Sequence, residues 1–389
     1  MTDDGLSRRR FLGRAGTTGI ALTGLPAIFA ACGIEGTGPT EEEAAQAQKA
    51  VSHPKTEIGN WTFSNWPLYM DKKVLRAFEK EYGGKIRYLE EINDNYEFLG
   101  KVGQQLEQKE PIGRDIVVLT DYMASRWVRN AYAEAIDKNN VPNAANLVDN
   151  LATISYDPER RFTMPFQSGA IGLGYNVKET GRELGSVADL FDPQFKGRVT
   201  MLSEPYDSAC TVLLGDGVDA SNAKIDEILG AIEKIDEVNR TGQFRRFTGN
   251  DYTTDLAKGN VWVSLAYSGD VVALQSDNPD LRFAYFEEGS MAFNDNLMMP
   301  AEVEHPYAAE TMINYLYEPE VAAKLAAYIN YISPVKGAKE ELEKTDPELA
   351  NNPLIFPPPE IQATLKAYPS LTPEDERTMQ EAMATVTGA

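Results

Sequence analysis

The sequence predicts an α/β protein built from two lobes. The chain has 389 residues, whereas one domain usually takes about 150. From Trp61 onward, short apolar runs alternate with amphipathic segments, which is the pattern of helices packed on a sheet. The continuous apolar run over residues 114–120, RDIVVLT, is typical of a parallel strand covered on both faces. With 42% apolar and 25% charged residues, the composition is that of a soluble globular protein.

The first half of the chain predicts a doubly wound unit of three strands and two helices. A strand ends at N-W-P-L-Y, residues 65–69, and strands over 85–91 and 114–120 follow. The first helix stops at a Gly-Gly pair and has its apolar residues at helical spacing: Val74, Leu75, Phe78 and Tyr82. The second helix is marked by Phe98, Leu99, Val102 and Leu106. Because ligands collect beyond the carboxyl ends of such strands, we expect 65–69 and 120–123 to lie at a binding site.

The second half repeats this alternation with different detail. Its predicted strands are 171–177, 197–203 and 261–267. The segments between them, predicted as helices or turns, are 207–217, 225–235 and 253–259. The end of the chain is expected to be helical and then looped, and no internal repeat of fixed period is present.

The N-terminal residues predict export. Residues 7–12, S-R-R-R-F-L, resemble the twin-arginine signal, and an uncharged stretch after them ends in A-A-C. We therefore expect a signal peptide over 1–31, lipidation of Cys32, and a tether over 32–56 that is too poor in large apolar side chains to fold independently. The alternative is an uncleaved membrane anchor over 15–34, although its Gly, Thr and Pro residues make it poorly hydrophobic.

The charge of the chain favours cationic partners. Without residues 1–31, the chain keeps 33 basic and 57 acidic residues, a net charge of −24. Such a field repels nucleic acid and anionic membrane surfaces and attracts cations. If Cys32 is lipidated, Cys210 has no disulfide partner and is expected to be a small buried apolar residue.

No motif indicates catalysis, a cofactor or a metal. The P-loop, G-x-S-x-G, H-E-x-x-H and calcium-loop patterns do not occur, and GAIGLG at 169–174 lacks the dinucleotide-binding spacing. The two histidines, His53 and His305, are too few for a histidine triad or zinc site. Acidic runs such as 41–43 and 287–288 are expected to be solvated faces. We therefore expect no catalytic residue and no resident cofactor.

Seven short segments in order resemble the spermidine/putrescine-binding proteins that serve ABC importers outside the membrane. The segments are N-W-x-x-Y, DIVVLTDYM, TMPFQSGAIGLGYN, FKGRVTMLSEPYDS, AYSGD, MAFNDNLMMP and NYISP. The resemblance covers residues 57 to 389. It implies the two-lobed periplasmic-binding-protein fold, type II-like, in which each lobe is a doubly wound sheet and crossover strands join the lobes.

The resemblance also implies boundaries. Lobe 1 would comprise 57–166 and 294–340, and lobe 2 would comprise 167–293 and 341–389. The segment 163–169 would be the first crossover, and the region before Asp295 the second.

A polyamine is a methylene chain interrupted by ammonium groups, so its receptor needs aromatic walls and spaced carboxylates. Cation–π contacts contribute about 0.5 to 2 kcal/mol each, and charged hydrogen bonds about 1.5 to 3 kcal/mol each. Two or three of each approach the roughly −8 kcal/mol of a micromolar complex. By the resemblance, the ligand-binding residues are Trp66, Tyr69, Thr120, Tyr122, Glu204, Asp207, Tyr267, Phe293, Asp295 and Tyr331.

Three positions depart from the family's pattern. Leu68 stands where N-W-T-E-Y members have an acid, and Tyr267 and Phe293 replace two Trp residues. One ammonium partner is thus missing and the walls are smaller. These changes could tune the site toward putrescine or shift it to another amine.

The expected function is capture of polyamines such as putrescine and spermidine by a monomeric, extracytoplasmic, lipid-anchored protein. Its partners would be an ABC permease and ATPase, with no nucleic acid and no membrane contact beyond the anchor. The alternative is a protein of the same fold for an opine, an amino-acid derivative, a phosphonate or a metal. From another class, an exported enzyme such as a hydrolase stays open.

Overall fold

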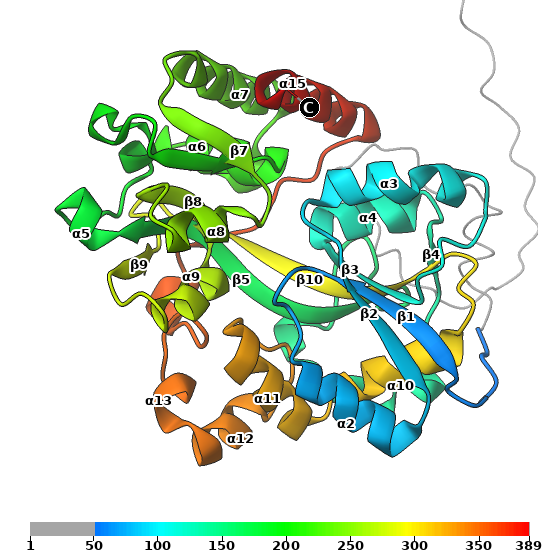
Figure 1. Cartoon of the computed structure of the whole chain (residues 1–389). Helices are drawn as coiled ribbons and strands as arrows, with labels where there is room; N and C mark the ends of the chain where they lie inside the picture. Colours follow the sequence, from blue (N-terminus) through cyan, green and yellow to red (C-terminus); the bar gives the residue numbers. More distant parts are fainter. Residues whose placement is uncertain (1–50, 389) are drawn as a thin grey trace, which may run out of the picture.

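The computed structural model describes residues 51–388 (Figure 1). The predicted signal peptide, Cys32 and the tether up to residue 50 lie outside this part. Residues 51–56 have no regular secondary structure, yet they are held in place. The backbone N–H of His53 donates to Asp137 Oδ2 at 3.1 Å, and its ring Nδ1 lies 2.6 Å from Oε1 of the buried Glu310. The end of the predicted tether therefore packs on the folded body. Within residues 51–388, no helix is long and apolar enough to cross a membrane.

A single path of paired strands runs through the molecule in the order β2-β1-β3-β10-β5-β8-β6-β7. One half holds three parallel strands, β1 (Asn60–Asn65), β2 (Lys85–Glu90) and β3 (Ile116–Thr120). The other half holds β6 (Val199–Leu202), β7 (Phe244–Thr248) and β8 (Val263–Tyr267), also parallel to one another. Short strands pair beside this path: β4 (Ala133–Glu134), β9 (Leu281–Ala284) and β11 (Leu365–Lys366). We call the half around β1–β3 lobe 1 and the half around β6–β8 lobe 2.

Two long strands belong to both lobes. Strand β5 (Thr163–Asn176) pairs with β10 (Ser290–Pro300) along residues 163–170 and with β8 and β9 along residues 171–176. Strand β10 also pairs with β3 in lobe 1, and its register against β5 shifts between Asp295 and Asn296. In Figure 1 the two strands run side by side from one half of the molecule to the other. The predicted two-lobed α/β fold is therefore confirmed, while the lobe boundaries given above stay a prediction.

The helices of lobe 1 follow local signals in the sequence. Helix α2 (Lys72–Tyr82) begins where Asp71 accepts a hydrogen bond from the N–H of Lys73 and ends at Gly83, whose φ is 82°. In Figure 1, α3 (Asn95–Glu107) and α4 (Asp121–Arg129) cover one face of β1–β3, and the other face is covered by α2, α10 (Pro306–Leu316) and α11 (Pro319–Ile329). Helices α12 (Ala338–Thr345) and α13 (Pro347–Ala350) follow, and α12 packs against α11.

Lobe 2 contains the helices predicted in the second half of the chain. They are α6 (Pro205–Gly215), α7 (Ile225–Arg240) and α8 (Tyr252–Ala257), with the short α5 (Val177–Thr180), α9 (Ser268–Gln275) and α14 (Pro359–Gln362) beside them. Cys210 is fully buried in α6, as expected, and burial raises the pKa of its thiol. The chain ends in α15 (Pro373–Thr387), which returns to pack beside α7 (Figure 1).

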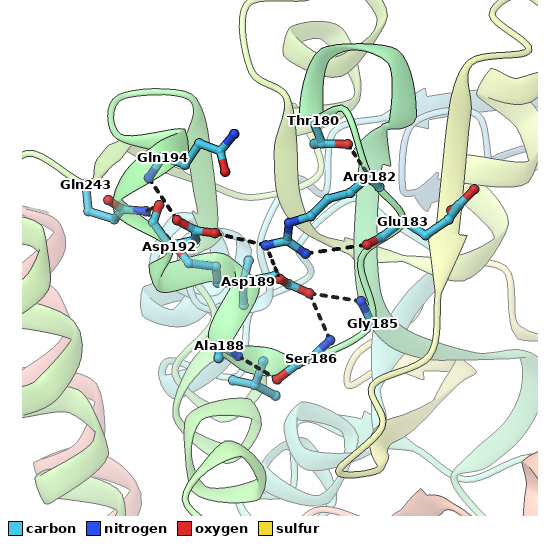
Figure 2. Close-up of polar contacts among 12 residues, drawn as sticks. Thr180, Arg182, Glu183, Gly185, Ser186, Ala188, Asp189, Asp192, Gln194 and Gln243 are labelled. Carbon is cyan, nitrogen blue, oxygen red and sulfur yellow. Dashed lines mark hydrogen bonds and ion pairs between the residues drawn. The ribbon is translucent and has the colours of Figure 1, made fainter.

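A charged cluster stabilises the loop between β5 and β6 in lobe 2 (Figure 2). The guanidinium of Arg182 lies 2.7 Å from Asp189 Oδ1 and 2.9 Å from Asp192 Oδ2. The second oxygen of Asp189 accepts hydrogen bonds from the backbone N–H groups of Gly185 and Ser186. One buried carboxylate thus satisfies two backbone donors and one cation in a loop without strand pairing.

Candidate functional site

A cavity of about 410 Å³, part of it open to solvent, lies between the two lobes. The cavity lies where the carboxyl ends of β1, β3 and β8 meet the shared strands, which is the place expected for a ligand in this architecture. Its lining residues are Trp66, Pro67, Tyr69, Thr120, Asp207, Asn250, Tyr267, Asp270, Phe293, Asp295, Tyr331 and Tyr368.

The N-W-P-L-Y segment forms a tight turn that directs two aromatic rings to the cavity. The buried side chain of Asn65 accepts from the N–H of Trp66 at 2.9 Å and donates to the carbonyl of Tyr69 at 3.1 Å. Pro67 and Leu68 make the turn between them, and Leu68 has a φ of 59° and is 61% exposed. A left-handed Leu is uncommon. The two hydrogen bonds of Asn65 close the turn at that position.

Asp295, on β10, is the acidic group at the lobe 1 wall. Its carboxylate accepts hydrogen bonds of 2.8 Å from the hydroxyls of Tyr69 and Thr120. Burial raises the pKa of Asp295 to about 7, although both hydroxyls act in the opposite direction. A buried carboxylate that receives hydrogen bonds from neutral groups favours an incoming cation, since the charge is only partly compensated.

Asp207, in the first turn of α6, is the acidic group at the lobe 2 wall. The hydroxyl of Tyr267 donates to its Oδ2 at 2.8 Å, and that of Tyr368 donates to its Oδ1 at 2.5 Å. Burial raises the pKa of this carboxyl to about 7 as well. The negative charge at the start of α6 is also favoured by the helix dipole.

A third carboxylate, that of Asp270, also lines the cavity, and it was not among the expected site residues. Asp270, in the first turn of α9, accepts from Asn250 Nδ2 at 2.7 Å, from the hydroxyl of Tyr252 at 2.8 Å and from the hydroxyl of Tyr331 at 2.9 Å. Burial raises its pKa. All the hydrogen bonds described for Asp207, Asp270 and Asp295 therefore come from uncharged donors.

Four aromatic rings make consecutive edge-to-face contacts along the cavity. Phe293 packs against Tyr267 at 5.3 Å and against Tyr331 at 5.9 Å, and Tyr331 packs against Tyr69 at 5.2 Å between ring centroids. Two glycines permit this arrangement. A Cβ on Gly169 would lie 2.5 Å from the ring of Phe293, and one on Gly269 would lie 2.4 Å from the ring of Tyr331.

Two of the ten expected site residues do not line the cavity. Glu204 is buried at the contact between the lobes, where its Oε1 accepts from the backbone N–H of Asn95 at 2.6 Å and from its Nδ2 at 2.9 Å. Its Oε2 has no hydrogen-bond partner among the described residues, and burial raises its pKa well above the ordinary value. Tyr122 stacks on Tyr206 with centroids 4.8 Å apart. Both residues join α3 and α4 of lobe 1 to α6 of lobe 2.

The other eight expected residues line the cavity: Trp66, Tyr69, Thr120, Asp207, Tyr267, Phe293, Asp295 and Tyr331. The four that sequence reasoning missed are Pro67, Asn250, Asp270 and Tyr368. Pro67 and Asp270 stand inside segments that carried the resemblance, N-W-P-L-Y and A-Y-S-G-D. Asn250 and Tyr368 lie in irregular segments with no pattern to mark them.

The arrangement is suited to binding a cation with an apolar body. Aromatic rings pack against methylene groups and their faces attract cations, and three carboxylates offer charged hydrogen bonds. Within residues 51–388 there is no group of three or more His, Cys, Asp or Glu side chains placed to hold a metal ion.

Comparison with known proteins agrees with this geometry. The chain is 28% identical over 342 residues to the putrescine-binding periplasmic protein PotF of Escherichia coli. The aligned region covers 83% of this chain and 90% of that protein. A spermidine/putrescine ABC transporter protein from Listeria monocytogenes has a similar structure, with a TM-score of 0.76, 23% identity, and coverage of 84% of this chain and 98% of that one. The binding protein AgtB from A. tumefaciens, solved with agropinic acid, has a TM-score of 0.68, 18% identity, and coverage of 85% and 99%.

The family model described as bacterial extracellular solute-binding protein matches residues 73–357, which is most of the chain. Members of this family bind solutes and are not enzymes. The match includes strands from both lobes and most of the cavity wall. This protein therefore belongs to the family of bacterial extracellular solute-binding proteins.

Proposed function

We propose that this protein is the substrate-binding component of an ABC importer and that it captures polyamines, such as putrescine, in the cavity between its lobes. The observation that carries the proposal is a set of three carboxylates in the cavity wall, the buried Asp207 and Asp295 and the half-buried Asp270, which are hydrogen-bonded by neutral donors and separated by aromatic rings. An ammonium group placed at such a carboxylate gains a charged hydrogen bond of about 1.5 to 3 kcal/mol.

The chemistry of the wall favours an amine over an acid. The agropinic acid bound by AgtB is a reminder that this fold accepts other solutes. An anionic solute calls for Arg or Lys in the wall, whereas none of the twelve lining residues in the described part of the chain is basic. The net charge of −22 for the whole chain acts in the same direction, because it attracts cations over longer distances.

We also propose that the protein is exported by the twin-arginine route and anchored through a lipid on Cys32. The support is the sequence S-R-R-R-F-L and the A-A-C segment. Mass spectrometry of the protein from membranes of the native cell tests this directly. The expected species begins at Cys32 with a diacylglyceryl group, and a chain that begins at Met1 without a lipid would refute it.

Isothermal titration with putrescine, spermidine, spermine and an opine tests the substrate. We expect micromolar or tighter binding of at least one polyamine and no binding of the opine. In Asp295→Asn the amide oxygen can still accept from one of the two hydroxyls, Tyr69 or Thr120, while the amide nitrogen donates to the other. The fold should therefore persist while the affinity for the amine falls about 30-fold, or about 2 kcal/mol. The matched control is Asp149→Asn, because that side chain is 94% exposed. Folded protein that binds no amine at millimolar concentration would refute the proposal.

A further inference from the structure

Tyr368 lies at the Asp207 end of the cavity. It follows the short strand β11, in a segment of the chain with no helix or strand of its own. Its hydroxyl donates to Asp207 Oδ1 at 2.5 Å, and the hydroxyl of Tyr267 donates to the other carboxylate oxygen, Oδ2. Both oxygens of this carboxylate are therefore already bonded from within the protein, and the ring of Tyr368 forms part of the wall.

The space behind Tyr368 is filled by two more tyrosines. Tyr122 of lobe 1 meets the ring of Tyr368 edge-on at 5.4 Å, and Tyr206 of lobe 2 meets it at 5.7 Å. Tyr122 and Tyr206 are stacked on each other and buried, and neither lines the cavity. The nearby Glu204 is held by Asn95. The three rings thus close this end by joining the two lobes.

Acidic groups stand at both ends of the cavity. Asp207 is bonded by Tyr267 and Tyr368, whereas Asp270 and Asp295 are bonded by Tyr331 and Tyr69, and the contacts of Tyr267 and Phe293 lie between these two groups. A diamine with one ammonium group at Asp207 and the other at Asp270 or Asp295 would leave Tyr368 in place. An amine that extends beyond Asp207 would have to displace Tyr368, which is hydrogen-bonded to Asp207 and packed against Tyr122 and Tyr206.

We propose that Tyr368 determines ligand length: its ring ends the cavity, so the site selects a diamine of putrescine length over spermidine. This inference rests on the proposed function and adds the substrate class within it. It assigns a selective role to a residue from the C-terminal segment, which contributes to the wall through tertiary folding alone. The ring sets the length limit, and the hydroxyl orients Asp207.

The test measures dissociation constants for putrescine, spermidine and a series of straight diamines in four proteins: the unmodified chain, Tyr368→Phe, Tyr368→Ala and the control Tyr328→Ala. Tyr328 is the matched tyrosine, since it is 44% exposed and does not line the cavity. In the unmodified chain, we expect putrescine to bind at least 10-fold more tightly than spermidine. In Tyr368→Phe, the ring remains, so that ratio should change less than threefold.

In Tyr368→Ala, the ratio should shift at least 10-fold toward spermidine, and the longest tolerated diamine should increase. Tyr368→Leu serves if circular dichroism shows that the Ala variant is unfolded. Equal affinity of the unmodified chain for putrescine and spermidine would overturn the inference, as would an unchanged ratio in Tyr368→Ala. If the unmodified chain binds no amine, the proposed function fails as well, and this outcome is distinct from binding without length selection.

Discussion

The affinity for a polyamine should fall steeply below pH 7. Burial raises the pKa of Asp295 to about 7 and that of Asp207 to about 7, so both carboxyls take up protons as the pH falls through this value. Alkyl ammonium groups, like the side chain of Lys, stay charged throughout. A neutral carboxyl cannot pair with an ammonium group, and binding therefore has to displace the proton. Affinity is lost as pH falls and is retained as pH rises.

The size of the effect follows from the pKa. At pH 5, which is two units below about 7, roughly one Asp295 in 100 is ionised, so the affinity should be about 100-fold weaker than at pH 8. This corresponds to about 2.7 kcal/mol at 1.36 kcal/mol per pH unit. If Asp207 contributes independently, the loss is larger. At pH 6.5, about three-quarters of each carboxyl with a pKa of about 7 is protonated, so binding should also release about 0.8 proton for each carboxyl that the amine engages.

Titration calorimetry measures both quantities. Dissociation constants for putrescine at pH 8, 7, 6 and 5 give the slope, and titrations at pH 6.5 in buffers of different ionisation enthalpy give the number of protons released. In Asp295→Asn the slope should become shallower, whereas Asp149→Asn should keep it. A dissociation constant that stays within threefold from pH 8 to pH 5, with the protein folded throughout, would refute the reasoning.

Three further predictions concern residues around the cavity and in lobe 2. Glu204→Gln should change the putrescine dissociation constant less than about threefold, because Gln can still accept from Asn95. Glu204→Ala should weaken binding about 10-fold, because the contact between the lobes loses this hydrogen bond. If the Gln variant binds as weakly as the Ala variant, Glu204 is instead an ammonium partner. Gly269→Ala should lower the free energy of unfolding or displace Tyr331, at a cost of about 1–3 kcal/mol, since its Cβ would lie 2.4 Å from that ring; urea unfolding checks this, and a variant with unchanged stability and affinity contradicts it. Asp189→Ala should cost about 1–3 kcal/mol of stability in the same assay, because two backbone donors lose their acceptor (Figure 2). The folded protein should bind putrescine normally, because Asp189 and its partners do not line the cavity; altered affinity would show that this loop reaches the site.

Short sequence patterns were sufficient to predict the strands and helices whose formation depends on neighbouring residues in the chain. The run at 114–120 became β3, buried along its whole length, and the helical spacing after N-W-P-L-Y became α2 with its stop at Gly83. By contrast, β7 was not predicted. Its sequence FRRFT has exposed arginines, because it lies at the end of the strand order with only one neighbour. The final helix α15 was also missed, because its apolar residues are sparse and its burial depends on α7 and α6.

The candidate site divides in the same way. Trp66 and Tyr69 come shortly after the end of β1, and Thr120 is the last residue of β3, so their position at the cavity edge could be predicted from the chain order. Tyr368 could not, since more than 160 residues separate it from its partner Asp207. Glu204 was expected to contact a ligand, whereas in the structure its Oε1 accepts from Asn95 at the start of α3, a residue 109 positions away in the sequence.

The sequence by itself determined the alternation of strands and helices, the acidic charge and the residue types that a cation requires, because periodicity, turn chemistry and charge are properties of short segments. Only the tertiary structure decided which carboxylates line one cavity, which tyrosines fill the space between the lobes and where the cavity ends. The physical reason is that these properties depend on contacts between residues far apart in the sequence. The pKa values of Asp207 and Asp295, for example, are raised by burial, and these side chains become buried only once β5 and β10 bring the two lobes together.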